Sequence, residues 1–212
     1  MLIPPAHDLP HGLYFYCLQI VRLSSRLLLG LGRRAITGRE HVPTTGGFIL
    51  ASNHASYFDP PILAVASPRQ MTYLAKVELF ARPWFARLIR SLGAITVERG
   101  KGDRDALALT IALLKAGHGL VVFPEGTRTR TGALGKIHAG AAMMALQARV
   151  PLVPAFIRGS FAAWPKSGKI RPAKVYVRIG APLAMDDLAA DAKSCRILRT
   201  RLQEAIEKLS LD

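Results

Sequence analysis

The sequence predicts an α/β fold, in which a mixed and largely parallel sheet is covered by helices. The first observation is length: 212 residues can form one domain with a substantial core, and no linker-like or repetitive stretch divides the chain. The second is that short β-branched runs alternate with longer helical segments, a pattern typical of α/β proteins. We therefore expect a single domain of this class.

Six short apolar runs are expected to form the strands of the sheet. The prolines Pro151 and Pro154 lie around the start of the fifth run, where they are interpreted as marking the strand edge. The runs cover residues 48–52, 71–75, 94–98, 120–123, 153–158 and 174–179.

Helices are expected between and after these strands. Residues 104–115 have the clearest helical pattern, with Asp103 as a possible N-cap and Gly117 just past the end. Residues 139–148 and 188–209 are also expected to be helical.

Residues 12–34 form an apolar segment nearly as long as the roughly 20 residues that span a membrane. Arg22 and Arg26 argue against spanning, because they lie one helical turn apart and would form a polar stripe while apolar side chains face the bilayer boundary. We expect a monotopic anchor, with a helix packed on the sheet core as the alternative. The segment lacks the cationic start and clean cleavage site of a signal peptide. The expected organisation is an amphipathic helical anchor over residues 1–37 and the main domain over residues 38–212.

The composition favours an anionic partner. With 29 Lys and Arg against 14 Asp and Glu, the formal net charge is +15. This charge suits a membrane surface, a phosphorylated lipid, coenzyme A or a nucleic acid, and does not choose among them. Cys17 and Cys195 have neither metal-ligand nor redox spacing and are interpreted as packing residues in a reducing compartment. His7 and His11 have a helical ligand spacing but no third ligand in view, so no metal site is expected.

The stretch from Asn53 to Asp59 places an imidazole and a carboxylate five positions apart, directly after the first expected strand. Five residues match neither the helix nor the strand period, so His54 and Asp59 can meet only if the chain turns between them. Asp59-Pro60 reads as an N-cap followed by proline at the first helical position, which provides that turn. The pair is typical of a general base, in which the carboxylate orients a histidine that takes a proton from a substrate hydroxyl. A structural histidine is the alternative.

An arginine follows each of two further expected strands. The segments from Gly93 to Arg99 and from Phe123 to Arg128 put a cation at the carboxyl end of a strand. Ligands of open α/β sheets bind beyond these ends, and a guanidinium binds phosphate through two hydrogen bonds. An anionic substrate group such as phosphate is therefore expected. Residues 124–137, rich in Gly, Thr and Arg, are expected to form a loop that can hold a substrate there.

Together with Val150-Pro-Leu-Val-Pro154, these motifs resemble the glycerolipid acyltransferase family, most closely its 1-acylglycerol-3-phosphate acyltransferases. The four blocks occur in the family's order, and the resemblance extends over about residues 38–182. It implies that His54 is the base and Asp59 its orienter. The chain departs from the family near Gly140, which leaves the roles of Lys136 and His138 open. The resemblance further implies a substrate site made by Asn53, Gly93, Arg99, Glu125, Gly126, Thr127 and Arg128.

The resemblance implies transfer of a fatty acyl group from acyl-CoA or acyl carrier protein to the sn-2 hydroxyl of 1-acylglycerol 3-phosphate, giving phosphatidic acid in phospholipid biosynthesis. The hydroxyl would attack the thioester directly, with backbone amides as the default oxyanion donors, unless Ser56 is a nucleophile. No metal or tightly bound cofactor is implied. The expected location is peripheral or monotopic on the cytoplasmic face of an anionic membrane.

Two alternatives remain. One is an enzyme of the same family that acts on glycerol 3-phosphate or another lysolipid. The other is a basic, non-enzymatic module that binds nucleic acid. The chain has none of the usual nucleic-acid-binding motifs, and its mean hydropathy of +0.22 is high for a soluble RNA binder. We therefore expect no nucleic-acid partner.

Overall fold

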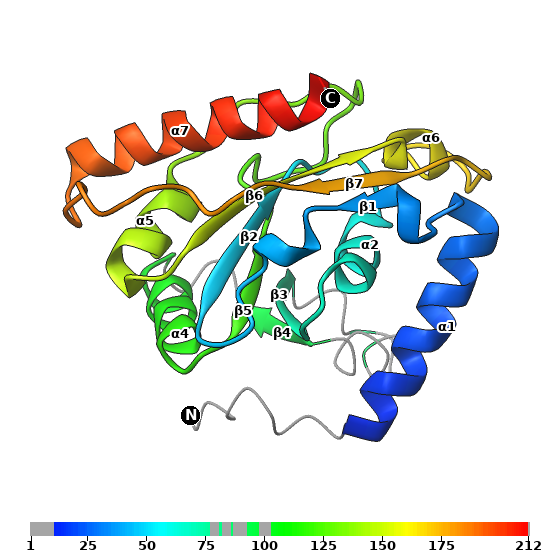
Figure 1. Cartoon of the computed structure of the whole chain (residues 1–212), viewed down its shortest axis with the longest axis horizontal. Helices are drawn as coiled ribbons and strands as arrows, with labels where there is room; N and C mark the ends of the chain where they lie inside the picture. The colour runs from blue at the N-terminus through cyan, green and yellow to red at the C-terminus, as the bar shows by residue number, and fades with distance from the viewer. Residues whose placement is uncertain (1–10, 77–80, 82–85, 87–92, 98–102, 212) are drawn as a thin grey trace.

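The computed structural model describes residues 11–76, 81, 86, 93–97 and 103–211 (Figure 1). The described strands form a seven-stranded sheet in the order β1-β7-β6-β2-β5-β3-β4. Neighbouring strands are parallel, except that β6 and β7 are antiparallel. The prediction of a mixed, largely parallel sheet is therefore confirmed.

The elements alternate along the chain much as expected. The strands are β1 (Ile36–Thr37), β2 (Phe48–Ser52), β3 (Met71–Lys76), β4 (Ala94–Val97), β5 (Gly119–Val122), β6 (Leu152–Arg158) and β7 (Tyr176–Ile179). The α-helices are α1 (His11–Leu29), α2 (Asp59–Ala66), α4 (Asp103–Lys115), α5 (Gly140–Ala148), α6 (Ser160–Ala163) and α7 (Ala192–Leu211). The six expected strands are confirmed, whereas β1 was not expected, because two residues are too short to carry a periodic pattern.

Helices cover both faces of the sheet and give a three-layer arrangement (Figure 1). Strand β2 shows why: Phe48 and Leu50 lie in one hydrophobic core, and Ile49 and Ala51 lie in the other. Helices α1 and α2 contribute to the first core, and α4, α5 and α7 contribute to the second. A strand buried on both sides needs a continuous apolar run, which is what residues 48–52 supply.

Local hydrogen bonds set the ends of the helices. Asp59 is the first residue of α2 and Phe58 occupies the N-cap position, so the prediction of Asp59 as the cap was wrong by one residue. The carboxylate instead binds the turn that precedes the helix. Gly117 follows α4 with a φ of 92°, and its N–H donates to the Leu114 carbonyl. Helix α7 begins later than expected because Asp191 accepts the Ser194 N–H at 2.7 Å, which caps the helix there.

Arg69 fixes the turns at the amino ends of the two central strands. Its Nη1 donates to the carbonyls of Pro43 (3.0 Å) and Gly46 (2.8 Å), and its Nη2 donates to that of Gly117 (3.0 Å). The guanidinium also lies over the ring of Phe48, 5.3 Å from its centroid. Burial lowers the pKa of Arg69 from its ordinary value. One side chain therefore joins the chain before β2 to the chain before β5.

Helix α1 has apolar side chains on two opposite faces. Leu18, buried, and Leu29, 2% exposed, lie in the core shared with α2. Ile20, Leu23 and Leu27 are 68%, 60% and 78% exposed and recur at the spacing of one helical face. We call these three residues the α1 stripe. One side of the helix therefore packs on the core, as the alternative expectation had it, and the exposed side is compatible with the expected anchor, which stays a prediction. Within the described residues, none of the helices combines the length and apolarity required to traverse a bilayer.

Candidate active site

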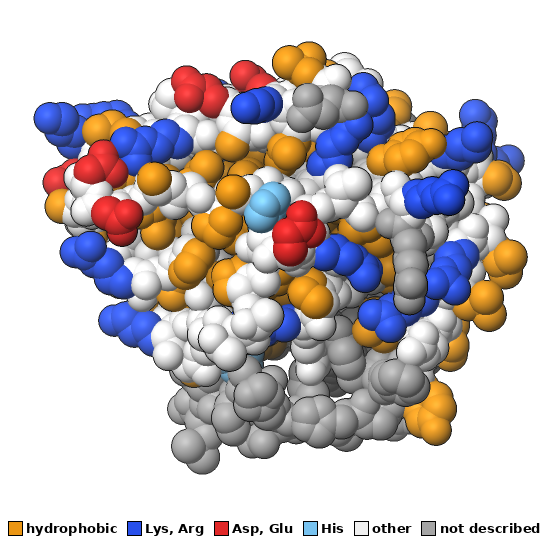
Figure 2. All heavy atoms as spheres, in the orientation of Figure 1, with side chains coloured by type: hydrophobic (Ala, Val, Ile, Leu, Met, Phe, Trp, Pro, Cys, Tyr) orange, Lys and Arg blue, Asp and Glu red, His pale blue; other side chains and the backbone are white. Residues whose placement is uncertain are grey.

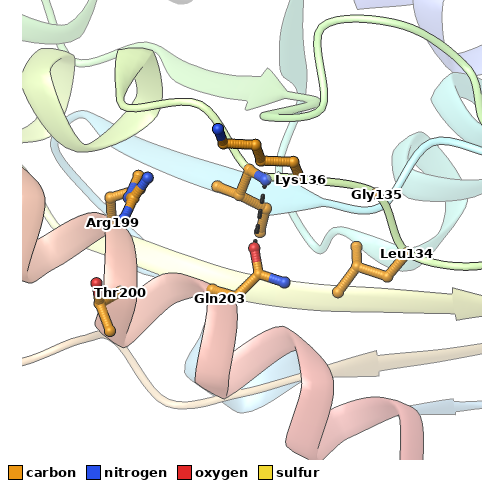
Figure 3. Close-up of a pocket in the computed structure, with 7 residues that line it drawn as sticks. Leu134, Gly135, Lys136, Arg199, Thr200 and Gln203 are labelled. Atoms are coloured by element: carbon orange, nitrogen blue, oxygen red, sulfur yellow. Dashed lines mark hydrogen bonds between the residues drawn. The ribbon is translucent and has the colours of Figure 1, made fainter.

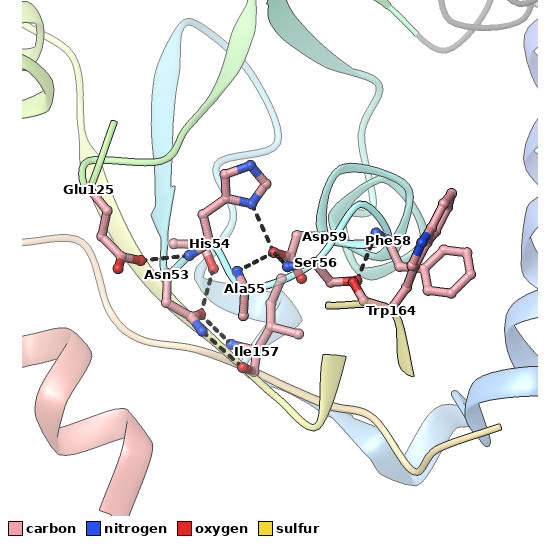
Figure 4. A network of polar contacts seen from close by, with 10 residues as sticks. Asn53, His54, Ala55, Ser56, Phe58, Asp59, Glu125, Ile157 and Trp164 are labelled. Carbon is pink, nitrogen blue, oxygen red and sulfur yellow. Dashed lines mark hydrogen bonds and ion pairs between the residues drawn. The ribbon is translucent and has the colours of Figure 1, made fainter. Parts of the chain in front are cut away.

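The candidate site lies at the carboxyl ends of the central strands, where His54 and Asp59 meet (Figure 4). His54 Nδ1 is 2.8 Å from Asp59 Oδ2. Because a carboxylate accepts hydrogen bonds, Nδ1 carries the proton, and the other ring nitrogen, Nε2, is left unprotonated in the neutral histidine. In Figure 4 this nitrogen points away from Asp59, and the His54 side chain is 18% exposed. The pair therefore has the geometry of a general base with an orienting carboxylate.

Asp59 also organises the turn that brings the pair together. Its Oδ2 accepts the backbone N–H of Ala55 at 2.6 Å and that of Ser56 at 2.7 Å, in addition to the imidazole. The side chain is fully buried, and these charge-assisted hydrogen bonds replace the water that Oδ2 loses, whereas Oδ1 has no hydrogen-bond partner among the described residues. The chain turn needed by the five-residue spacing is thus built by the carboxylate itself.

The backbone and the ring of His54 are each held from a second side. Its N–H donates to Glu125 Oε1 at 2.7 Å, and its carbonyl accepts the Thr129 N–H at 2.8 Å. The ring stacks on Phe123 with centroids 3.9 Å apart and an interplanar angle of 16°. Residues after β5 therefore fix where the imidazole after β2 lies.

Both carboxylate oxygens of Glu125 accept backbone hydrogen bonds. Oε1 binds the His54 N–H, and Oε2 binds the Gly135 N–H at 2.7 Å. Burial raises the pKa of Glu125 above its ordinary value, while the N–H donors of His54 and Gly135 act in the opposite direction. The structure therefore places Glu125 as a link between the His54 turn and the loop that follows β5.

Asn53 forms a similar link on the other side of β2. Its Oδ1 accepts the Ile157 N–H at 2.7 Å, and its Nδ2 donates to the Ile157 carbonyl at 3.0 Å. The side chain is buried at 4% exposure. This pair of hydrogen bonds joins the ends of β2 and β6 and fixes the residue directly before His54.

Arg128 lies over Tyr57, an aromatic residue of the His54 motif. Its Cζ is 3.4 Å from the centroid of the Tyr57 ring, within the range of a cation–π contact. Tyr57 and Phe58 in turn pack against Trp164, with ring centroids 4.8 Å and 5.0 Å apart. Arg128 Nη1 is buried and has no hydrogen-bond partner in the described part of the chain. A buried donor without a partner is costly unless a ligand supplies an acceptor.

The remaining expected site residues, Gly93, Arg99, Gly126 and Thr127, have no described contact with the side chains of His54 and Asp59. Gly126, with a φ of 71°, and Thr127 form an exposed turn after β5. Gly93, with a φ of 92°, lies where a Cβ would be 2.2 Å from the Met71 carbonyl oxygen, so glycine permits the approach of β4 to β3. No contact between Gly93 and the His54 pair is seen in the described residues. Arg99 lies outside the described residues.

The hydroxyl of Ser56 is engaged in two hydrogen bonds that do not involve His54. Its Oγ donates to the Trp164 carbonyl at 2.9 Å and accepts the Phe58 N–H at 3.1 Å. The residue is fully buried. The Ser56 hydroxyl is therefore not directed at His54, the candidate base.

A pocket of about 480 Å³ lies between the loop after β5 and helix α7 (Figure 3). It is separate from the His54 pair, although Gly135 at its edge is bound by Glu125. Gln203 Oε1 accepts the Ile137 N–H at 3.3 Å across it. Lys136 and Arg199 are the charged residues of its lining. Lys136 thus faces this pocket, and His138 is exposed with its N–H bound to the Pro124 carbonyl.

Sequence reasoning missed several supporting residues, among them Tyr57, Trp164 and Ile157. Tyr57 lies inside the His54 motif, but its contact with Arg128 joins two segments that are far apart in the sequence. Trp164 and Ile157 carried no signal, because their partners lie 108 and 104 positions away in the sequence.

Comparisons with known proteins identify related chains. A family model described as "Acyltransferase" matches residues 33–158. The 1-acyl-sn-glycerol-3-phosphate acyltransferase of Bacillus subtilis is 31% identical over 180 residues, which cover 84% of this chain and 85% of that protein. A protein of the same name from Cocos nucifera is 30% identical over 171 residues, and the match spans 78% of this chain and 55% of that longer protein.

A solved structure has the same architecture. The crystal structure of the 1-acyl-sn-glycerophosphate (LPA) acyltransferase of Thermotoga maritima superposes with a TM-score of 0.76 at 25% sequence identity. The match covers 94% of this chain and 80% of that chain. The residues matched by the family model include His54, Asp59 and Glu125.

Proposed function

Because this chain belongs to the acyltransferase family, we propose that it transfers a fatty acyl group from an acyl thioester to the sn-2 hydroxyl of 1-acylglycerol 3-phosphate, producing phosphatidic acid. The donor is acyl-CoA or acyl carrier protein, and the acceptor is a lysophospholipid. The observation that carries the proposal is the His54–Asp59 pair, with Nδ1 bound at 2.8 Å and Nε2 directed away from the carboxylate.

The chemistry follows from that geometry. His54 Nε2 takes the proton of the acceptor hydroxyl as its oxygen attacks the thioester carbonyl carbon. Asp59 stabilises the imidazolium that forms. The tetrahedral intermediate then expels the thiolate, which takes the proton from His54 and leaves as a free thiol. No acyl-enzyme forms, in keeping with the hydrogen bonds that occupy Ser56.

Arg128 is assigned to the phosphate of the acceptor. Its Nη1 is a buried donor that lacks a hydrogen-bond partner among the described residues, and phosphate oxygens are strong acceptors for a guanidinium. Arg99, Gly93, Gly126 and Thr127 are proposed to complete the substrate site. Asn53 and Glu125 are proposed to act through His54, because their polar atoms bind backbone groups around it.

Membrane attachment is assigned to the N-terminal segment, residues 1–37, as a peripheral or monotopic anchor on the cytoplasmic face. The α1 stripe supports this assignment, because three large aliphatic side chains on one helical face are exposed. Residues 38–212 form the acyltransferase domain in this proposal.

The test is an assay of free thiol release by the purified full chain in detergent, with acyl-CoA and lysophosphatidate. Thiol release that depends on the lysolipid supports acyl transfer, and thiol release of equal rate without any acceptor would contradict it. Replacing lysophosphatidate by glycerol 3-phosphate or by other lysolipids separates the possible acceptors. Acyl carrier protein loaded with the same acyl group separates the two donors.

A further inference from the structure

The segment that joins α6 to β7 is strongly basic. Residues 165–174 read Pro-Lys-Ser-Gly-Lys-Ile-Arg-Pro-Ala-Lys and contain no acidic residue. We call this segment the basic loop. Its central apolar residue, Ile170, is 50% exposed. The four cations of the loop are all exposed to solvent: Lys166, Lys169, Arg171 and Lys174.

Hydrogen bonds hold the end of the basic loop against helix α1. The Ala173 N–H donates to the Leu28 carbonyl at 3.1 Å, and the Val175 N–H donates to the Leu29 carbonyl at 2.9 Å. These carbonyls belong to the last turn of α1, which has no following helical N–H groups to bind. The basic loop and the carboxyl end of α1 are therefore fixed side by side.

The other end of the basic loop reaches the active site. Trp164, the residue directly before the loop, accepts the Ser56 hydroxyl through its carbonyl and packs on Tyr57 and Phe58. The Arg171 N–H donates to the Ala163 carbonyl at 2.8 Å, which folds the loop back toward this wall. The loop thus runs from the aromatic residues beside His54 to the apolar helix α1.

Charge and apolar surface gather at this end of the molecule. Figure 2 shows Lys and Arg side chains at the right of the view, where the basic loop and the carboxyl end of α1 lie in Figure 1, and hydrophobic side chains along the edge occupied by α1. Among the described residues, no carboxylate forms an ion pair with a cation of the basic loop. The loop therefore presents uncompensated positive charge beside exposed aliphatic side chains.

We propose that the basic loop is a second membrane-binding element, which binds the headgroups of anionic lipids while the α1 stripe enters the bilayer boundary. This inference extends the membrane attachment proposed above, and it adds a separate, salt-sensitive site. Cations near an anionic surface are attracted to it, and Ile170 gives the loop an apolar side chain to insert among the headgroups. Because the loop begins directly after Trp164, its docking holds the His54 site at the level of the headgroups, where the hydroxyl of a lysolipid lies.

The test compares binding of the full chain to sedimented vesicles of phosphatidylcholine alone and of phosphatidylcholine with phosphatidylglycerol. Loss of three charges near an anionic surface should weaken binding to the anionic vesicles by about 100-fold at low salt, and should leave the weak binding to neutral vesicles unchanged. The loop variant carries Lys166→Gln, Lys169→Gln and Arg171→Gln.

The matched control removes the same charges from helix α7, on the other side of the sheet, through Lys193→Gln, Arg196→Gln and Lys208→Gln. This control should bind as the unchanged chain does. The single substitution Ile170→Ser removes the apolar side chain of the loop and keeps its charges. It should weaken binding to both kinds of vesicle several-fold, irrespective of salt. Melting temperature and thiol release with detergent-dispersed substrate should be the same in all variants.

Three results would overturn the inference. The loop variant could bind anionic vesicles like the unchanged chain, the two triple variants could lose binding equally, or the loop variant could keep vesicle binding and lose binding to single-stranded RNA. The first gives the loop no role in docking, the second assigns the effect to net charge alone, and the third assigns the loop to nucleic acid. Vesicle binding is measured without turnover, so these results stand whether or not acyl transfer is found.

Discussion

At the scale of single residues, Asp59 Oδ2 is the atom on which the site depends. It accepts hydrogen bonds from the imidazole of His54 and from two backbone N–H groups of the turn. The same oxygen therefore orients the base and shapes the turn. Substitutions at this position should affect the geometry of the chain as well as the proton transfer, whereas substitutions of His54 should affect the transfer alone.

We expect His54→Ala to lower kcat by about 10²–10⁴, the usual contribution of a positioned general base. Asp59→Asn should also lose rate, because a neutral amide can accept the Nδ1–H but does not stabilise the imidazolium. Steady-state kinetics and melting temperature check both variants. Turnover near that of the unchanged chain in a folded His54→Ala variant would rule out this mechanism.

Arg128 and Tyr57 give a prediction about acceptor affinity. Arg128→Ala should weaken binding of a phosphorylated acceptor by about 2 kcal/mol, as expected when a charge-assisted hydrogen bond is lost. Tyr57→Leu should weaken acceptor binding by less, about 1 kcal/mol, and raise KM accordingly, because the guanidinium loses its aromatic support. Tyr57→Phe keeps the ring and should retain the KM of the unchanged chain. The control acceptor is a lysolipid without phosphate. Equal losses with both acceptors would contradict the assignment of Arg128 to the phosphate.

Glu125 gives a prediction about pH. Burial raises its pKa in the folded state, so its contribution to the free energy of unfolding is fully present below about pH 4.5 and is lost as pH rises through the folded pKa. Glu125→Gln does not titrate. The melting temperature of the unchanged chain should therefore fall relative to that of the variant as pH rises from about 4.5 toward neutrality. A difference that stays constant across this range would show that the pKa is not raised.

At the scale of elements, the amino ends of β2 and β5 depend on one side chain. Arg69→Met should lower the free energy of unfolding by about 2 kcal/mol, because three carbonyls lose a charged donor. Urea unfolding measures the change, and Arg196→Met on exposed α7 is the control. Arg69 lies at the amino ends of the strands, whereas His54 lies at their carboxyl ends. The variant should therefore retain kcat at temperatures where it is folded. An unchanged urea midpoint would show that the three hydrogen bonds add nothing to stability.

The two faces of α1 make opposite predictions for the same substitution. Leu29→Ser removes a side chain that is 2% exposed and should cost about 3 kcal/mol of stability. Leu27→Ser changes one that is 78% exposed and should keep the melting temperature but weaken binding to phosphatidylcholine vesicles. Thermal unfolding and vesicle sedimentation check the pair. If Leu27→Ser binds vesicles as the unchanged chain does, the α1 stripe is not the anchor.

At the scale of the whole molecule, the sequence predicted what is local and missed what is long-range. The strands around His54 followed from apolar runs, and the His54–Asp59 pair followed from a spacing that only a turn can close. The contact of Asn53 with Ile157 was beyond sequence reasoning, because it depends on β2 and β6 being neighbours in the sheet. Glu125 was expected to bind substrate, but its neighbours His54 and Gly135 belong to two separate loops whose meeting no sequence pattern records.

The order of strands also determines when the site can form as the chain is synthesised. His54 and Asp59 lie five positions apart and can pair early, but the Glu125 that holds the His54 backbone follows 71 positions later, and Ile157 follows Asn53 by 104. Central strand β2 has no sheet partner until β5 has emerged, and it is enclosed only when β6 follows. Helix α1, in contrast, needs only local contacts to form and precedes β2 in the chain. A growing chain therefore presents helix α1, the proposed membrane anchor, well before His54, the proposed base, is held in place, so on this proposal contact with a membrane can precede the appearance of activity.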